Sequence, residues 1–157
     1  MARVDVQLAC EEADVPHADR IREWVDQALA AADAATGPNA EVSVRIVGVE
    51  EMKSLNHEYR DKDQVTNVLS FPGGELTGLP DEATRTLGDI VVCAAVIRGE
   101  AREQNKALAD HWAHMLVHGT LHLLGYDHMT DDEATAMEGL EVRILTSLGV
   151  DDPYRVQ

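Results

Sequence analysis

The chain has 157 residues, of which 45% are hydrophobic, and these values suit one globular domain with one substantial core. Its formal net charge of -16 disfavours non-specific binding to nucleic-acid backbones or anionic lipid, so RNA binding would need a local basic site. The two cysteines form no Cys-x-x-Cys pair and the longest apolar run, Ile90 to Ile97, is too short to cross a bilayer, so we expect a reduced, cytosolic protein without a membrane span.

Strand and helix patterns alternate in the first half of the chain. Apolar residues recur with a period of two in the segments predicted as strands, and on one stripe in those predicted as helices. Pro16 is expected at the first helical position, and Gly37 with Pro38 ends that helix. The expected strands here are residues 4–8, 42–48 and 65–71, and the expected helices are 16–36 and 50–60.

The second half begins with a segment rich in glycine and proline, residues 72–87, which is predicted to be a mobile loop. A fourth strand starts at Leu87, and its continuous apolar run indicates burial on both faces. The pattern then becomes helical, and Thr130 with Glu133 forms a capping box for the last helix. The expected helices begin at about residue 94 and span 107–124 and 130–148, with a frayed tail at 151–157.

Strands interleaved with helices define the fold class. The pattern predicts a single α+β (α/β-like) domain over residues 1–157, with a small mixed sheet of about four strands and about five helices. The order of the strands does not follow from the pattern.

One stretch, residues 118–128, holds three of the seven histidines. Its sequence is His-Gly-Thr-Leu-His-Leu-Leu-Gly-Tyr-Asp-His. His118 and His122 are four residues apart, so on a helix they share one face. Gly125 can take the left-handed conformation that ends the helix, which lets His128 return over the helix end. The spacing predicts a three-histidine zinc site, one ion per chain, with a position open for water or substrate.

The same spacing occurs in metzincin proteases, where a glutamate general base follows the first histidine. That position is Gly119 here, so the usual base is absent. A ligand set of His114, His118 and His122 is a rival on spacing alone. Three ligands along one straight helix span about 12 Å, however, and Zn–N bonds are only about 2.0–2.1 Å, so His114 is better placed as a packing, supporting or substrate-side residue.

Other polar residues permit two interpretations. His111 is grouped with His114 as a packing, supporting or substrate-side residue. Asp127 either orients a ligand imidazole or is solvated. Asp89 is interpreted as structural rather than as a site residue. Arg98, Arg102 and Lys106 are spaced as one helical stripe, which is interpreted as a solvated face in preference to an RNA or ribosome contact.

The histidine stretch, read with the segments 59–72 and 87–90, closely resembles the YbeY family of bacterial metal-dependent endoribonucleases. The resemblance covers nearly the whole chain, and Asn-Val-Leu-Ser-Phe-Pro at 67–72 supports it independently. It implies zinc on His118, His122 and His128 and a functionally important, catalytic-site arginine at Arg60. It also implies maturation of the 3′ end of 16S rRNA and ribosome quality control in the cytoplasm, with single-stranded rRNA, the small ribosomal subunit and its proteins as partners, and no membrane or DNA.

Two other functions remain open on the sequence. A metalloprotease or amidohydrolase is favoured by the metzincin-like spacing and disfavoured by Gly119. A ribosome-assembly factor with non-catalytic zinc is disfavoured by a site with only three protein ligands, because structural zinc normally has four. For a nuclease, the residues do not show whether a zinc hydroxide, a histidine or the RNA 2′-hydroxyl provides the base.

Overall fold

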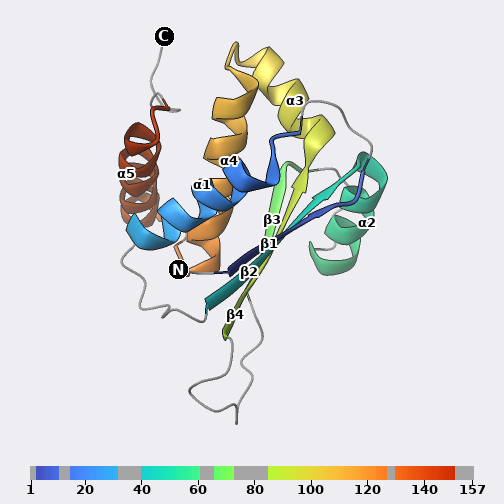
Figure 1. Cartoon of the computed structure of the whole chain (residues 1–157), viewed down its shortest axis with the longest axis horizontal. Helices are drawn as coiled ribbons and strands as arrows, with labels where there is room; N and C mark the ends of the chain where they lie inside the picture. The colour runs from blue at the N-terminus through green and yellow to red at the C-terminus, as the bar shows by residue number, and fades with distance from the viewer. Residues whose placement is uncertain are drawn as a thin grey trace.

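Four strands and five helices form in the part of the chain that the computed structural model describes, residues 3–10, 15–31, 40–60, 66–72, 85–126 and 130–150 (Figure 1). The strands are β1 (Arg3–Leu8), β2 (Ala40–Val47), β3 (Val68–Pro72) and β4 (Arg85–Cys93). The helices are α1 (Ala18–Ala31), α2 (Val49–Arg60), α3 (Ala94–Glu103), α4 (Leu108–Leu123) and α5 (Asp131–Ser147).

The strands make one mixed sheet with the order β1-β2-β4-β3. β1, β2 and β4 are parallel, and β3 pairs with β4 in the antiparallel sense as an edge strand. The predicted α+β domain with a small mixed sheet and about five helices is therefore confirmed. Since β3 pairs Ser70 with Ile90, the edge strand runs directly beside the centre of β4.

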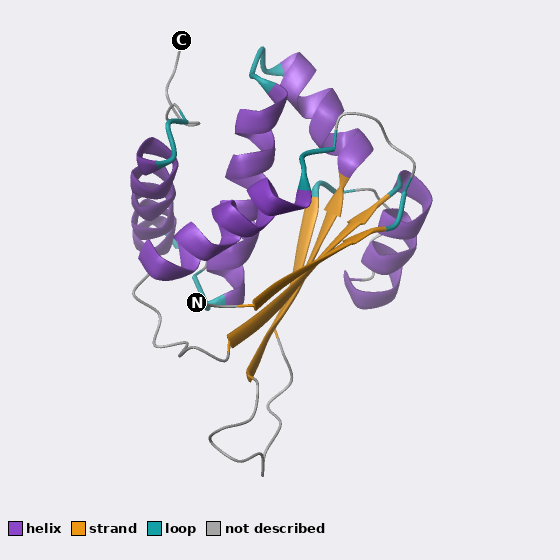
Figure 2. Ribbon diagram, in the orientation of Figure 1, coloured by secondary structure: helices purple, strands orange, loops and turns teal. Residues whose placement is uncertain are grey.

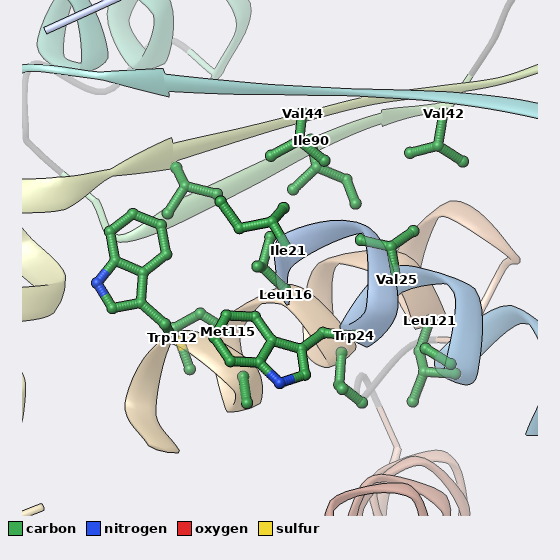
Figure 3. Close-up of a cluster of buried hydrophobic side chains, with 14 of the residues drawn as sticks. Ile21, Trp24, Val25, Val42, Val44, Ile90, Trp112, Met115, Leu116 and Leu121 are labelled. Carbon is green, nitrogen blue, oxygen red and sulfur yellow. The ribbon is translucent and has the colours of Figure 1, made fainter. Parts of the chain in front are cut away.

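The inner face of the sheet is covered by α1 and α4, and α5 lies outside them (Figure 2). Every second side chain of β2 and β4 points to this face, because successive residues of a strand face opposite sides of the sheet. They meet large residues of α1 and α4, among them Trp24 and Trp112, which are 3% and 1% exposed (Figure 3). The core residues labelled there are Ile21, Trp24, Val25, Val42, Val44, Ile90, Trp112, Met115, Leu116 and Leu121.

The outer face of the sheet carries a smaller core under α2. Met52 of α2 packs there with the outward-facing residues Val47, Leu69, Val91 and Cys93. Ile90, Val91 and Val92 are consequently all buried, as the apolar run of β4 predicts. The two helices α2 and α4 thus lie on opposite faces of one sheet (Figure 1).

Several predicted boundaries are wrong by a few residues. α1 begins at Ala18 and not at Pro16, because the ring nitrogen Nδ1 of His17 accepts a hydrogen bond from the Asp19 N–H and starts the helix there. β4 begins at Arg85, so the end of the predicted loop 72–87 is strand. Pro72 belongs to β3, and Thr66 and Asn67 precede that strand.

Some predictions lie outside the described residues. These are the end of the first predicted helix beyond Ala31, the loop at 73–84 and the tail at 151–157. In the described part of the chain, none of the helices is both long enough and apolar enough to cross a membrane.

Candidate metal centre

Helix α4 approaches the sheet closely at Gly119. A Cβ at this position would lie 3.1 Å from Cγ2 of Ile90, 3.2 Å from Cγ2 of Val68 and 3.3 Å from Oγ of Ser70. The Ser70 hydroxyl also donates a hydrogen bond of 2.9 Å to the Gly119 carbonyl. The position that carries the metzincin glutamate therefore faces the packed sheet and has no room for a longer side chain, so the site cannot use a base from there.

His118 and His122, one turn apart on α4, direct the same ring nitrogen to a common point. Their Nε2 atoms are 3.0 Å apart and their ring centroids 4.5 Å apart. Two imidazole nitrogens on a tetrahedral zinc ion, each bonded at about 2.0–2.1 Å, would be about 3.3 Å apart. The pair is therefore close to the geometry that a shared metal ion requires, and both rings are only half-buried.

A carboxylate from α5 lies behind this pair. Glu141 Oε1 is 3.1 Å from Nδ1 of His118, and Glu141 Oε2 is 2.9 Å from Nε2 of His114. Burial acts to raise the pKa of Glu141, but the hydrogen bonds from His114 and His118 outweigh it and hold that pKa at about 2, below the ordinary 4.5. The carboxyl group is therefore ionised at neutral pH and can only accept hydrogen bonds.

His114 takes a different position from the other two histidines. Its Nε2 atom is directed to Glu141, and its ring centroid is 6.3 Å from that of His118. The rival ligand set of His114, His118 and His122 therefore has no geometric support in the structure. His114 is a supporting residue, which is one of the roles expected from the sequence.

The third predicted ligand, His128, lies outside the described residues, as does Asp127. Within the residues that are described, no three His, Cys, Asp or Glu side chains are grouped so that they could hold a metal ion.

The backbone leading to His128 is described up to Tyr126. Gly125 has a φ of 96°, and the N–H groups of Gly125 and Tyr126 donate to the carbonyls of His122 and Leu121. This pair of bonds is a Schellman motif, and the positive φ predicted for Gly125 is confirmed.

Glu141 was missed by the sequence analysis, although the sequence contains a signal for it. The residue lies within the apolar stripe of α5, between Met137 and Leu140 on one side and Ile144 and Leu145 on the other. An acidic residue on the buried face of an amphipathic helix needs a partner, because an unpaired buried carboxylate is very unfavourable. Asp127, the carboxylate expected to support the histidines, is close to them in sequence, whereas Glu141 is 23 residues from His118.

A second polar cluster lies further along α4, around His111. Its Nε2 donates a 3.0 Å hydrogen bond to Glu100 of α3, and Asn67 donates to both oxygens of the same carboxylate at 3.1 and 3.2 Å. Burial lowers the pKa of His111 and outweighs the opposing hydrogen bond to Glu100. The cluster joins the segment before β3 to α3 and α4, so His111 has a packing role and does not contact the histidine pair.

Two residues considered from the sequence lie on the other side of the sheet. Arg60 is the last residue of α2, which packs on the outer face, and its side chain is outside the described part of the structure. Asp89 is exposed and lines an open pocket of about 330 Å³ on that face, together with Arg45 and Glu51. The structure therefore does not bring Asp89 to the histidine pair, in agreement with a role outside the site.

The fold and the site define an α+β domain whose central helix presents two convergent imidazoles, one of them backed by a buried carboxylate. The chain belongs to the YbeY family, since residues 6–149 match the family model described as Endoribonuclease YbeY. It is 53% identical to Endoribonuclease YbeY of Alcanivorax borkumensis over 96% of this chain and 85% of that protein. It is 56% identical to the protein of the same name from Alkalilimnicola ehrlichii over 92% of this chain and 85% of that one.

A solved structure shares the fold. The solution structure of TM1509 from Thermotoga maritima matches with a TM-score of 0.55, covering 99% of this chain and 100% of that one. Because the two sequences are only 23% identical, this similarity supports the arrangement of strands and helices and nothing further.

Proposed function

We propose that the chain is a zinc-dependent endoribonuclease that cleaves single-stranded RNA. The observation that carries the proposal is the convergence of the His118 and His122 Nε2 atoms to 3.0 Å. Membership of a family described as endoribonucleases gives the substrate class. His128 would complete the ligand set, reached through the turn at Gly125.

The residues fit the ion that the proposal requires. The two imidazoles are accessible from solvent, and Glu141 accepts the hydrogen bond of His118 at the ring nitrogen opposite the convergence point. When bound, zinc supplies a Lewis acid that polarises a phosphoryl oxygen and promotes the deprotonation of water. The protein positions the two nitrogens on a helix packed against the sheet, and Gly119 permits that packing. Without a glutamate at 119, a histidine or the RNA itself would accept the remaining protons.

We further propose that the substrate is ribosomal RNA at the 3′ end of 16S rRNA, that the enzyme takes part in ribosome quality control, and that it meets the small ribosomal subunit and its proteins. These proposals are supported by the resemblance of residues 59–72, 87–90 and 118–128 to the family. The net charge of -16 is compatible with contacts to basic ribosomal proteins. A peptidase is disfavoured because the tight packing around Gly119 excludes a catalytic glutamate.

The proposal is tested by metal analysis coupled to an RNA-cleavage assay. Wild type is expected to contain one zinc per chain and to cleave single-stranded RNA, and a chelator should stop the cleavage. His118→Ala should lose both metal and cleavage, whereas His57→Ala, which removes an exposed histidine on α2, should lose neither. Casein serves as the second substrate. The proposal would be overturned if wild type cleaved casein and left RNA intact, or if a metal-free His118→Ala sample cleaved RNA.

A further inference from the structure

Glu141 holds two imidazoles that come from successive turns of α4, one on each carboxylate oxygen. Oε1 is 3.1 Å from Nδ1 of His118, and Oε2 is 2.9 Å from Nε2 of His114. From this geometry we infer that Glu141 is a positioning residue, which fixes the ring nitrogen that His118 presents to the metal. The inference rests on the proposed function, because it concerns the same site.

A neutral imidazole carries one proton, on one of its two ring nitrogens. A carboxylate only accepts hydrogen bonds, so the proton of His118 must be on Nδ1 where Glu141 lies. Nε2 of His118 is then left with a lone pair, and this is the atom that lies 3.0 Å from Nε2 of His122. Glu141 therefore selects the tautomer in which His118 is ready to bind a metal ion.

The carboxylate is held firmly enough to exert this selection. Its side chain is 1% exposed, so water does not compete for the oxygens. Its backbone belongs to α5, where the neighbouring Leu140 and Ile144 are 6% and 1% exposed in the main core. His114, whose side chain is 10% exposed, occupies the second oxygen and prevents the carboxylate from turning away from His118. Both the position and the orientation of the acceptor are thus determined by the packing of α5 on α4.

The experiment compares two replacements of Glu141 with a packing control. Glu141→Gln keeps the shape but has a single carbonyl oxygen, so it can accept from only one of the two imidazoles. Glu141→Leu has no acceptor. Ile144→Val, on the same buried stripe of α5, shortens a core side chain and removes no hydrogen-bond acceptor. For each protein, zinc affinity is measured by competition with a chelating dye, the melting temperature by thermal unfolding, and the His118 tautomer by imidazole ¹⁵N chemical shifts in metal-free protein.

We expect zinc affinity to fall about 10-fold in Glu141→Gln and about 100-fold in Glu141→Leu, the range known for residues that orient metal ligands. In wild type the His118 shifts should indicate protonated Nδ1 alone, and in Glu141→Leu a mixture of tautomers. Ile144→Val should lower the melting temperature and leave zinc affinity and tautomer unchanged.

Three results would overturn the inference. These are unchanged zinc affinity in Glu141→Leu, an unchanged His118 tautomer in that variant, or a loss of zinc affinity in Ile144→Val as large as that in Glu141→Gln. The last would mean that Glu141 acts only by holding α5 in place. A wild type that binds no zinc would refute the proposed function instead, and the tautomer measurement on metal-free protein would still decide the inference about Glu141.

Discussion

Ser70 donates a 2.9 Å hydrogen bond from its hydroxyl to the carbonyl of Gly119, and so joins the edge strand β3 to the helix that carries the histidine pair. The contact is possible because residue 119 has no side chain. Val68 and Ile90 occupy the space that a Cβ would need. The close packing of helix and sheet places the backbone of α4, and with it His118, at a defined distance from β3 and β4.

The first prediction concerns Gly119→Ala. Alanine is favoured over glycine in a helix by about 1 kcal/mol, but overpacking a core costs about 1–3 kcal/mol. We expect the packing cost to prevail and the free energy of unfolding to fall by about 1 kcal/mol, as measured by urea denaturation. Gly139→Ala is the matched control, because it lies in α5 with no atom within 4 Å of the added Cβ and should gain about 1 kcal/mol. Equal stabilisation of both variants would show that the space at 119 is not limiting.

The sequence was sufficient to predict the parts of the fold that depend on local patterns. The alternation of apolar residues in β2 is typical of a strand, and the apolar stripe in α1 is typical of a helix. Both elements were therefore predicted correctly, even where their ends were misplaced. The N-terminus of α5 was found from Thr130, whose hydroxyl accepts the Glu133 N–H at 3.1 Å as a capping box requires. Strand order was not predictable, because it depends on contacts between distant segments.

The histidine pair was predictable because its contact is local in the sequence, and Glu141 was not because its contact joins two distant segments. His118 and His122 are neighbours through the helical repeat, which the sequence displays directly. Glu141 meets His118 only because α5 packs on α4, and no local rule relates residues on two packed helices. Likewise, the packing of α2 on the sheet face opposite α4 depends on contacts between segments that are distant in the sequence.

The second prediction concerns the turn at Gly125. With a φ of 96° and no atom within 4 Å of an added Cβ, Gly125→Ala introduces backbone strain of about 1–2 kcal/mol and no clash. We expect zinc affinity to fall although no ligand is removed, because the strain changes the path of the chain from His122 toward His128. Gly149→Ala provides the control, since it ends α5 with a φ of 81° in the same type of turn. It should lose similar stability while keeping its zinc affinity, and a parallel loss of affinity in both variants would contradict this.

The third prediction concerns the linkage between zinc and stability. A ligand that binds only the folded chain at 100 times its Kd stabilises it by about 2.7 kcal/mol. We expect this increase in the free energy of unfolding for wild type and its absence in His118→Ala, His122→Ala and His128→Ala. Calorimetric titration should give one site per chain. Retention of zinc by His128→Ala combined with its loss in His114→Ala would show that the ligand assignment is wrong.

The fourth prediction concerns pH and His111. Burial lowers the pKa of His111 below its ordinary value of 6.5, against the opposing hydrogen bond to Glu100 and with a further lowering by Lys106. Between the lowered pKa and 6.5 the unfolded chain binds more protons, so the stability that neutral His111 provides is complete above pH 6.5 and is lost as the pH falls below it. Metal-free wild type should therefore lose stability from pH 7.5 to 5.5 more steeply than His111→Gln. If urea denaturation showed the same loss of stability with falling pH in both proteins, His111 would be excluded as a source of the pH dependence.

The last prediction concerns Arg60, which the family resemblance implicates in function. It ends α2, on the sheet face opposite α4. A chain with a net charge of -16 repels RNA, so a phosphate contact needs a fixed cation, and the arginine fork matches phosphate oxygens and keeps its charge. From that face Arg60 would bind the RNA backbone.

We therefore expect Arg60→Glu to keep its zinc and melting temperature and to lose RNA cleavage, and Arg60→Lys to recover part of the activity because it restores the charge without the fork. Arg143→Glu, an exposed site on α5 with the same change in net charge, corrects for general repulsion of RNA and should retain most of the activity. The assay is cleavage of single-stranded RNA by metal-replete samples, with zinc content and melting temperature measured on each. Full activity in Arg60→Glu would remove Arg60 from the site and leave the histidines as its supported residues, because a lost phosphate contact cannot leave the cleavage rate unchanged.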